Sequence, residues 1–266
     1  MKKIIKKLKL LKHLLIAILA YWYYGRPARK LIVVGVTGTK GKSTTCRLIA
    51  SVLEESGNKV GMLTTVEFQI GEKRIPNDKK MTMLGLGQIQ KMLRAMVKNG
   101  CKYAVVETSS EGIMQYRHYG LHYDVAVFTN LGTEHSERHG GFENLKRDKG
   151  KMFSALNTKR KKIFGARVPK IIVTNLDDPN AQYFSSFPAD EKWGYSLDAE
   201  KFGSVEIYTI VGKIVGHENG KPQFLVGNDK YNLNIIGDFN VYNALAAIAV
   251  GKSQGLTTEQ ISRGLA

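Results

Sequence analysis

A glycine-rich segment that ends in Lys-Ser has the residue types and spacing of a phosphate-binding loop. It runs Gly38-Thr39-Lys40-Gly41-Lys42-Ser43-Thr44. Glycines let backbone N–H groups approach phosphate oxygens, the Lys42 ammonium can reach the β- and γ-phosphates, and the Ser43 hydroxyl can ligate Mg²⁺. The strict spacing of such a loop would have glycine at Val36, so the prediction of nucleotide binding also depends on the flanking elements.

Those flanking elements are a strand and a helix, as this kind of loop requires. The β-branched run 31–34 is typical of a buried parallel strand, and the helical stretch after Ser43 ends at Gly57. Further along the chain, predicted strands alternate with predicted helices. The strands are expected near 31–36, 60–64, 103–107, 125–129 and 171–174, and the helices near 43–56, 86–99 and 143–156. This alternation predicts an α/β fold, a P-loop-type, mostly parallel sheet with helices on both faces, and short runs near 203–236 add a small antiparallel β segment.

Composition and charge exclude several classes of protein. The 266 residues are 43% hydrophobic, which excludes a wholly disordered chain, and Cys46 and Cys101 are the only cysteines, which excludes a disulfide scaffold. The net charge of +17 is concentrated in residues 1–30 and 146–170, which carry +9 each. Because the remainder is close to neutral, a uniformly basic coat for nucleic acid is not expected.

The N-terminal segment has the pattern of a helix that contacts a membrane. Its apolar side chains lie on one helical face, at Ile4, Leu8, Leu11, Leu15, Ile18 and Trp22. Basic side chains lie on the opposite face, at Lys2, Lys6, Lys9 and His13. The uncharged run 14–24 is too short to span a bilayer, so we expect residues 1–24 to lie on an anionic membrane surface. A signal peptide, a spanning helix over 8–24 and a helix packed on its own domain are the alternatives.

Five sequence blocks together resemble the Mur ligases, the amide-forming enzymes of peptidoglycan synthesis. The chain is most similar to the branch that adds the third amino acid to UDP-N-acetylmuramoyl-L-Ala-D-Glu. The phosphate loop is the first block, and four others follow in the family's order. The second block is 105–110, followed by Gln115 and Arg117. The third is 128–131, followed by Glu134-His135, His139-Gly140 and Lys149. The fourth and fifth are 175–178 and 239–247.

The resemblance implies an ATP-dependent carboxylate–amine ligase that works through an acyl phosphate, with ATP and Mg²⁺ as cofactors. Ser43 and Glu107 would hold one magnesium and His135 would help to hold a second. Lys149 matches the lysine that the family carbamylates. By the same resemblance, Asn240 and Asn243 would contact adenine, and the muramoyl-peptide substrate would contact Thr82, Ser109 and Arg117.

Each of these residues also has a structural interpretation. Glu107 could be a surface carboxylate, His135 a structural histidine, and Asn240 and Asn243 helix caps. Lys149 lies among other cations, where a solvated charged face is the default. The nearby basic run 159–162 could be a solvated loop or an addition to the membrane-facing side.

The departures from the family pattern limit the functional prediction. About 30 residues precede the strand that leads into the loop, where the family has a UDP-binding domain, so the substrate could be lipid-linked rather than UDP-linked. Thr82 lies in Met-Thr-Met rather than Thr-Thr-Pro, Glu111 replaces a histidine, and Glu134 replaces an aspartate. The chain stops at Ala266, where the family's amino-acid-binding third domain would begin. We therefore expect little ligase turnover from this chain alone, and a third-domain partner in trans is one way to complete it.

These observations predict two units, a membrane-contact helix over 1–25 and a Mur ligase central ATP-binding domain over 30–266. The expected location is the cytoplasm, at the inner face of the cell membrane. The first interpretation of function is a ligase of peptidoglycan precursor synthesis. The alternative is a membrane-tethered, non-catalytic ATP-binding module that scaffolds other cell-wall enzymes.

Overall fold

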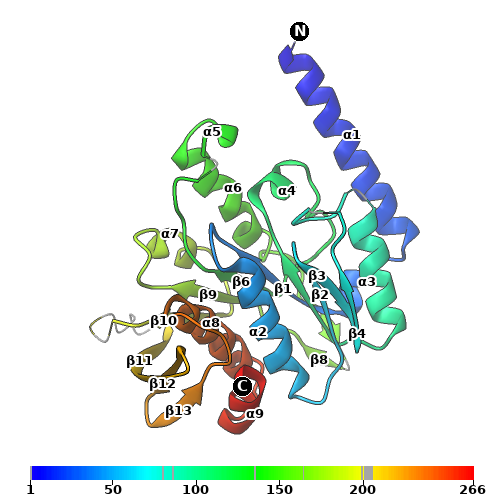
Figure 1. Ribbon diagram of the computed structural model, residues 1–266. Helices are drawn as coiled ribbons and strands as arrows, with labels where there is room; N and C mark the ends of the chain where they lie inside the picture. The colour runs from blue at the N-terminus through cyan, green and yellow to red at the C-terminus, as the bar shows by residue number, and fades with distance from the viewer. Residues whose placement is uncertain are drawn as a thin grey trace.

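The protein is built around one large sheet, seen in a computed structural model. The structure describes residues 2–79, 81–85, 87–134, 136–163, 165–198, 200 and 206–266, with only the backbone of residues 2–7. Within these residues the sheet has eleven strands in the order β13-β12-β11-β10-β9-β6-β1-β5-β2-β3-β4 (Figure 1).

The seven central strands are parallel, and an antiparallel hairpin extends each end of the sheet. The parallel strands are β1 (Ile32–Thr37), β2 (Val60–Leu63), β5 (Tyr103–Glu107), β6 (Val125–Phe128), β9 (Ile171–Asn175), β10 (Glu191–Ser196) and β11 (Tyr208–Glu218). The end hairpins are β3 (Glu67–Ile70) with β4 (Lys73–Pro76), and β12 (Lys221–Val226) with β13 (Asp229–Asn232). A separate hairpin pairs β7 (Lys162–Ile163) with β8 (Ala166–Arg167).

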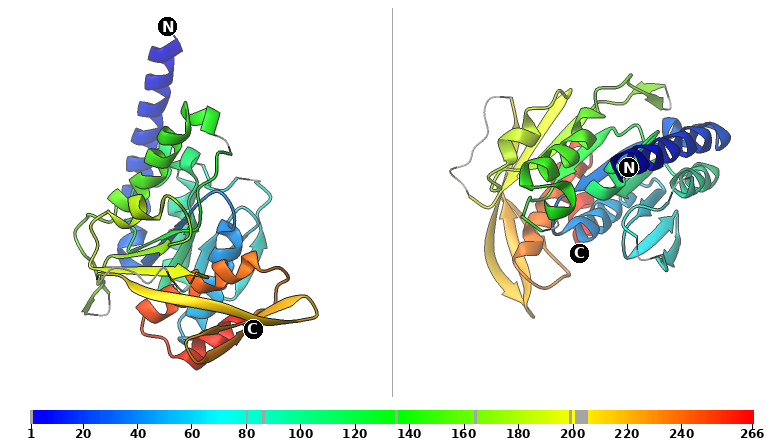
Figure 2. Two further views of the ribbon diagram at one scale, coloured as in Figure 1. Left: turned by 90° about the vertical axis from the view of Figure 1, so that its left-hand side faces the viewer. Right: turned by 90° about the horizontal axis from the view of Figure 1, so that it is seen from above.

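Helices cover both faces of the sheet. One face carries α2 (Lys42–Glu54), α8 (Phe239–Ser253) and α9 (Thr258–Leu265). The other carries α3 (Gln88–Lys98), α4 (Ser110–Met114), α6 (Phe142–Ser154) and α7 (Ala181–Ser185), while α5 (Ser136–His139) precedes α6 and the short η1 (Pro27–Lys30) precedes β1. Figure 2 shows these two layers from above.

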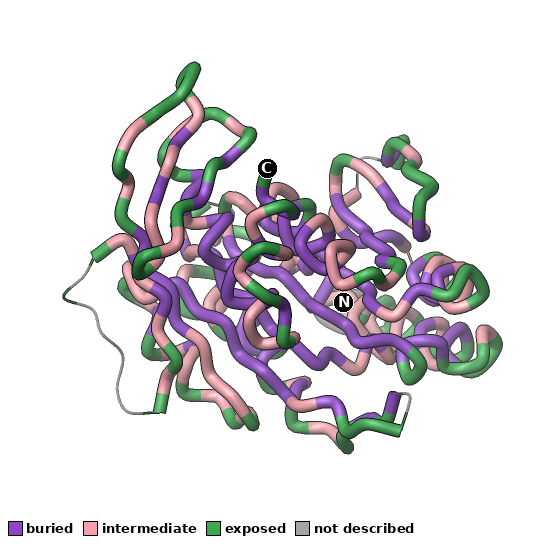
Figure 3. The backbone as a smooth tube through the Cα atoms, turned by 90° about the horizontal axis from the view of Figure 1, so that it is seen from below, coloured by how far each residue is buried: buried purple, intermediate pink, exposed green. Residues whose placement is uncertain are grey.

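Strand β1 shows why the apolar runs are continuous. Ile32, Val34 and Val36 pack toward α2 and α8, whereas Val33 packs toward α3 and α6. Since both faces are covered, every position of the strand is buried, and Figure 3 shows the central strands as continuous buried segments. Cys46 and Cys101 are free and buried in these two cores.

The sequence prediction of the mostly parallel α/β fold is confirmed, with one correction at the edge. The segment expected near 203–236 does contain an antiparallel pair, but β11 also joins β10 in parallel, so it extends the main sheet rather than forming a separate addition. The run expected to begin at 203 lies partly outside the described residues, and the strand starts at Tyr208.

Helix α1 (Lys2–Tyr23) packs by one side only. Ala17, Ala20 and Tyr21 are buried, and the Tyr21 hydroxyl is 2.9 Å from Nε2 of His122. The predicted apolar stripe is instead exposed, at Leu8, Leu11, Leu15 and Trp22, with Leu19 and Tyr23 beside it. Figures 1 and 2 show the N-terminal half of the helix standing clear of the α/β body. The C-terminal half of the helix therefore packs on its own domain, whereas Leu8, Leu11, Leu15 and Trp22 of the stripe stay exposed.

None of the helices in the described part of the chain is both long and apolar enough to cross a bilayer. That finding contradicts the alternative of a spanning helix over 8–24. It leaves the exposed stripe of α1 as a surface feature of the molecule.

The basic run 159–162 is solvated only in part, since Lys159, Arg160 and Lys162 are exposed and Lys161 is not. Lys161 is buried, and its Nζ donates to Asp124 at 2.5 Å and to the Leu31 carbonyl at 2.9 Å. Arg160 forms an ion pair with Asp190. The neighbouring hairpin, labelled at β8 in Figure 1, lies at the opposite end of the molecule from the N-terminus of α1. The run thus lies away from the N-terminal end of α1, and its addition to a membrane-facing side stays a hypothesis.

Candidate functional site

The phosphate loop lies between the carboxyl end of β1 and the first turn of α2. Gly41 has φ 79°, a conformation that disfavours side chains, and a Cβ there would lie 2.4 Å from the Asn243 Oδ1. A Cβ on Gly38 would lie 1.9 Å from Oγ1 of Thr129. Both glycines are thus required by close approach of neighbouring elements, and Lys42, Ser43 and Thr44 open the helix behind them.

The loop between these glycines is held by the segment after β6. The Thr39 N–H donates to the Asn130 carbonyl at 2.9 Å, and the Lys40 N–H donates to the Asn130 Oδ1 at the same distance. Thr129 donates its hydroxyl to the Lys40 carbonyl at 2.8 Å. Lys40 itself is exposed and pairs with Glu134 at 3.1 Å. These tertiary hydrogen bonds hold the backbone of the loop against the segment after β6.

Glu107 ends β5 directly behind the first turn of α2. It accepts the Ser43 hydroxyl at 2.7 Å and the Thr65 N–H at 2.8 Å, and it is only 2% exposed. The alternative of a surface carboxylate is therefore wrong. A hydroxyl and a carboxylate oxygen that converge in this way are the hard donors that Mg²⁺ prefers, with water and phosphate completing its shell.

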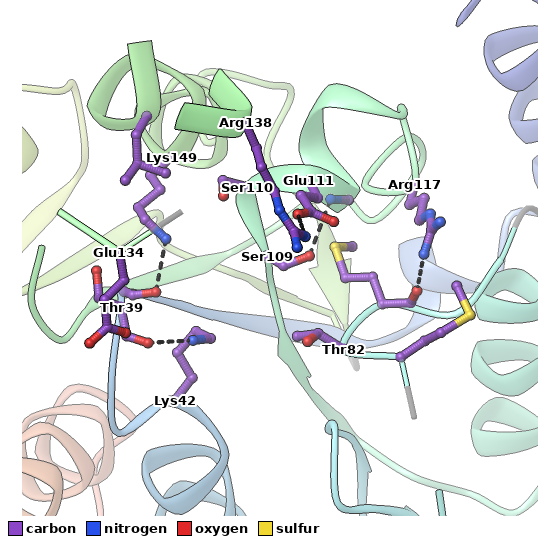
Figure 4. Close-up of a pocket in the computed structure, with 15 residues that line it drawn as sticks. Thr39, Lys42, Thr82, Ser109, Ser110, Glu111, Arg117, Glu134, Arg138 and Lys149 are labelled. Atoms are coloured by element: carbon purple, nitrogen blue, oxygen red, sulfur yellow. Dashed lines mark hydrogen bonds and ion pairs between the residues drawn. The ribbon is translucent and has the colours of Figure 1, made fainter. Parts of the chain in front are cut away.

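Two lysines approach the loop from opposite sides (Figure 4). Lys42 Nζ donates to the Thr39 carbonyl at 2.9 Å, and Lys149 Nζ donates to the Gly38 carbonyl at 2.8 Å. Lys149 is 4% exposed, so it is not part of a solvated charged face. Burial, followed by the nearby charge of Lys42, lowers the pKa of Lys149 to about 7.

A cavity of about 370 Å³ joins the loop to the residues predicted to contact substrate. Thr82, Ser109 and Arg117 line it together with Lys42 and Lys149. Figure 4 shows the two lysines at one end of this pocket and Arg117 at the other. The structure therefore brings these five predicted residues around one space.

Two of these lining residues also stabilise the local backbone. Ser109 is the N-cap of α4, where its hydroxyl accepts the Gly112 N–H at 3.1 Å. The Arg117 guanidinium donates to the Met83 carbonyl at 2.5 Å and to Gln115, and burial lowers its pKa. Arg117 is thus a pre-positioned cation in the wall of the pocket.

Asn240 and Asn243 lie on the other side of the loop, in the first turn of α8. Asn243 accepts the Thr45 hydroxyl at 2.9 Å and donates to Asn240 at 2.8 Å, while Asn240 donates to the Ile236 carbonyl at 2.8 Å. Both are buried, and neither caps α8, which rules out the helix-cap interpretation. They connect α8 to the phosphate loop and do not line the substrate pocket.

His135, the predicted ligand of a second magnesium, lies outside the described residues. Among the residues that the structure does describe, no group of three or more His, Cys, Asp or Glu side chains is arranged to hold a metal ion. The first predicted site, with one hydroxyl and one carboxylate, suits a cation bound largely through phosphate and water.

Comparison with known proteins assigns the family. The model of the Mur ligase middle domain matches residues 36–251. The chain belongs to the Mur ligase family.

Its curated relatives carry names of one branch of that family. The Mur ligase chain is 33% identical over 252 residues to the UDP-N-acetylmuramoyl-L-alanyl-D-glutamate--2,6-diaminopimelate ligase of Geobacillus kaustophilus, covering 94% of this chain and 49% of that protein. It is 35% identical over 249 residues to the UDP-N-acetylmuramyl-tripeptide synthetase of a Roseiflexus species, covering 92% and 48%. The chain thus spans about half the length of these relatives.

Solved structures agree with the family fold. A UDP-N-acetylmuramoyl-L-alanyl-D-glutamate--2,6-diaminopimelate ligase superposes with a TM-score of 0.68 at 26% identity, over 88% of this chain and 46% of that one. Folylpolyglutamate synthetase from Lactobacillus casei superposes with a TM-score of 0.62 at 16% identity, over 94% and 66%, and shows the fold alone.

One departure of this Mur ligase chain from the family pattern, Glu111, forms an ion pair in the wall of the pocket. Glu111, where the family usually has histidine, accepts from Arg138 at 2.6 Å, and both side chains line the cavity. Figure 4 shows Arg138 reaching down from α5 toward Glu111 on α4. Sequence reasoning noted Glu111 but missed Arg138, because the two are far apart in the sequence and only the fold pairs them.

Sequence analysis also missed a buried Ser-His-Asp array beside Lys149. His139 Nε2 is 3.0 Å from the Ser110 hydroxyl, and its Nδ1 is 2.7 Å from Asp148. Asp148 also accepts from Lys151 at 2.6 Å. The array ties α4 to α5 and α6, so it fixes the wall of the pocket that carries Lys149. No pattern in the sequence indicates that these three residues are in contact.

Proposed function

We propose that this Mur ligase chain binds ATP and Mg²⁺ and activates the carboxylate of a muramoyl-peptide for amide formation. The observation that carries this proposal is the shared pocket. It joins the lysines at the phosphate loop, Lys42 and Lys149, to the substrate-binding candidates Thr82, Ser109 and Arg117. A phosphoryl donor and a carboxylate acceptor bound at its two ends would face each other.

In this proposal the loop holds the triphosphate. The backbone of Gly38, Thr39, Lys40 and Gly41 would shape the loop around the phosphates, and Thr44 would offer a donor at the start of α2. The Lys42 ammonium would move from the Thr39 carbonyl to the phosphates. Ser43 and Glu107 would hold Mg²⁺, which when bound supplies positive charge beside the phosphates. His135 remains the proposed ligand of a second ion, and Asn240 and Asn243 the proposed contacts of the adenine side.

The substrate carboxylate attacks the γ-phosphorus, which gives ADP and an acyl phosphate. The amine of the incoming amino acid then attacks the acyl carbon, forms the amide and expels phosphate. Lys42 and Arg117 offset the negative charge of these groups. The muramoyl-dipeptide named for the relatives fits this pocket chemistry, whether its carrier is UDP or a lipid.

Lys149 is the proposed site of carbamylation. Only the neutral amine reacts with CO₂, and a pKa of about 7 makes that form abundant at neutral pH. The buried position, 2.8 Å from the Gly38 carbonyl, would place the resulting carbamate at the loop. A carbamate is an oxygen ligand, so it would serve magnesium rather than repel it.

We further propose that residues 1–25 form a membrane-contact unit and residues 30–266 the nucleotide-binding domain. The exposed stripe of α1, with Trp22 and Leu15 more than half exposed and no acid among residues 1–30, supports contact with an anionic surface. The protein would then work at the cytoplasmic face of the membrane.

The decisive experiment measures ATP turnover with UDP-N-acetylmuramoyl-L-Ala-D-Glu and a panel of amino acids. The chain is assayed alone and with the amino-acid-binding domain of a relative added in trans. Phosphate release that requires both substrates, and that Lys42→Met abolishes, would support the ligase. Mg²⁺-dependent ATP binding without turnover in either assay would favour the non-catalytic, tethered module. Absence of ATP binding would contradict both.

A further inference from the structure

A second, larger cavity lies on the other side of α4, between the body of the protein and α1. Its volume is about 840 Å³, within the range of small-molecule sites. Figure 1 shows α4 between α6 and α1. The lining residues come from these three helices and the turn after α4; they are Lys9, Leu10, His13, Ile113, Met114, Gln115, Tyr116, His118, Asp148, Lys151, Ser154 and Ala155.

The chemistry of this lining is apolar with a cationic rim. Leu10, Ile113 and Met114 give it aliphatic surface, and Lys9 is exposed at its edge. Asp148 is the one acidic residue in the lining, and its two oxygens are already engaged by His139 and by Lys151. No carboxylate in the lining is left to repel an anion.

Two histidines in the wall add unused hydrogen-bonding capacity. The Nδ1 atoms of His13 and His118 are shielded from solvent and have no hydrogen-bond partner among the described residues. Burial lowers the pKa of His118 to about 4, so its ring is neutral at physiological pH. Unpaired polar atoms in an otherwise apolar wall are costly, which is consistent with a space that a ligand completes.

The surroundings of the cavity indicate where such a ligand would come from. The helix that forms one wall, α1, exposes Leu8, Leu11 and Leu15 to solvent, and its N-terminal end projects from the body. Its cations are not balanced by any acid in residues 1–30. A molecule with a hydrocarbon chain and an acidic head matches both the cavity and the helix beside it.

We propose that this cavity binds an anionic membrane lipid, with hydrocarbon against Leu10, Ile113 and Met114 and the acidic head at Lys9. The proposal rests on the membrane contact proposed above for α1. It adds a defined binding site, because a helix that only lies on a bilayer requires no cavity beneath it.

The site would also connect the membrane to the substrate pocket. Ser109 to Gly112 line the substrate pocket, and Ile113 to Tyr116, on the same helix and the turn after it, line the lipid cavity. One short helix thus forms a wall of both spaces. A bound lipid would lie next to the place where a muramoyl-peptide is expected.

The test uses the full chain and a soluble probe, a fluorescent polyene fatty acid kept below its micelle concentration. Two pairs of variants are compared with the unmodified chain. Lys9→Glu reverses the charge at the rim, and Lys12→Glu is its matched control, since Lys12 is an exposed lysine of α1 outside the cavity lining. Ser154→Trp fills the cavity from its exposed edge, and Ser154→Ala leaves it open.

The expected result is saturable binding that Lys9→Glu and Ser154→Trp each weaken by about tenfold or more, while both controls bind as the unmodified chain does. Equal binding by all four variants, or no binding by the unmodified chain, would overturn the proposal. Circular dichroism and Mg²⁺-ATP binding check that each variant is folded.

Co-sedimentation with vesicles of anionic and of neutral phospholipid separates this site from the membrane contact itself. If Ser154→Trp loses the fatty acid but still sediments with anionic vesicles, the cavity and the surface contact are distinct and both are supported. If the chain binds the fatty acid but no vesicles, the cavity stands and the membrane contact proposed for α1 is wrong.

Discussion

The phosphate loop and helix α1 are opposite cases of how a sequence pattern becomes structure. The loop is surrounded: Gly41 lies against Asn243, Asn130 binds the backbone at Thr39, and Lys149 donates to the Gly38 carbonyl. Helix α1 is surrounded on one side only and leaves large apolar side chains in solvent. Each was the clearest pattern in its part of the chain.

The difference shows which kind of binding partner each region can accept. The loop backbone is already held in place, so ligand binding should lose little conformational entropy there. The affinity should therefore depend on individual polar groups of the loop. Leu8, Leu11 and Leu15 on the stripe of α1 are more than half exposed, so the contribution of the stripe should appear only when an apolar surface is added. The following predictions are in order of expected effect.

Replacing Lys42 with Met should weaken Mg²⁺-ATP binding by about 100-fold, because it removes a charge-assisted contact with the phosphates. Isothermal titration calorimetry measures the change. Lys40→Met is the matched control, since Lys40 is exposed and paired with Glu134, and it should change affinity less than about threefold. Equal losses in the two variants would mean that the loop attracts phosphate only by its net charge.

Lys149 should make the stability of the folded chain depend on pH. Its pKa is about 7 when folded and about 10.4 when unfolded, so between these values the unfolded state binds more protons. The free energy of unfolding should therefore rise from pH 7 toward pH 10, on the order of 2 kcal/mol for this group.

Urea denaturation in carbonate-free buffer measures this rise, and Lys149→Met should reduce it. If bicarbonate is then added to the unmodified chain, carbamylation should increase its stability at neutral pH and should have no effect on Lys149→Met. An unchanged pH profile in Lys149→Met would show that the buried lysine is not the source.

The double variant Leu11→Ser and Leu15→Ser should lower the affinity for anionic vesicles by about tenfold, because both side chains are half exposed on the stripe of α1. It should leave ATP binding and stability almost unchanged. Val66→Ser is the control, an apolar residue 65% exposed elsewhere on the surface. Vesicle binding that falls equally in both would mean nonspecific adsorption.

The smallest effect is expected at the ion pair between Glu111 and Arg138. Both side chains are substantially exposed, at 44% and 59%, so Glu111→Gln should change the free energy of unfolding by less than about 0.5 kcal/mol. A change in substrate affinity without loss of stability would show that the pair controls access to the pocket. Thermal denaturation and the KM for the muramoyl-peptide provide the two measurements.

Much of the site could be predicted because its chemistry is local. Lys42 and Ser43 follow Gly41 directly, and Glu107 ends an apolar strand, so their position at one edge of a parallel sheet follows from the strand order. The array of Ser110, His139 and Asp148 could not be predicted, because no local pattern indicates contacts between residues 29 and 9 positions apart.

Two default interpretations, each of a lysine as part of a solvated charged run, failed for the same physical reason. The run that contains Lys161 suggested a solvated patch, yet that lysine is buried against Asp124. Lys149 also lies among cations and is buried beside the loop. Charge along the sequence does not reveal which long side chain turns inward to a partner, since that choice depends on the other elements packed around it.

The parallel sheet, the phosphate loop and the separate apolar and basic faces of α1 follow directly from the sequence, since they depend on residue types at short and regular spacing. Only the tertiary structure decided which face of α1 is free, which lysines are buried, and that Ser109 and Ile113 line different cavities on one helix. Those properties depend on long-range packing, where burial, distance and charge arise from elements that are remote along the chain.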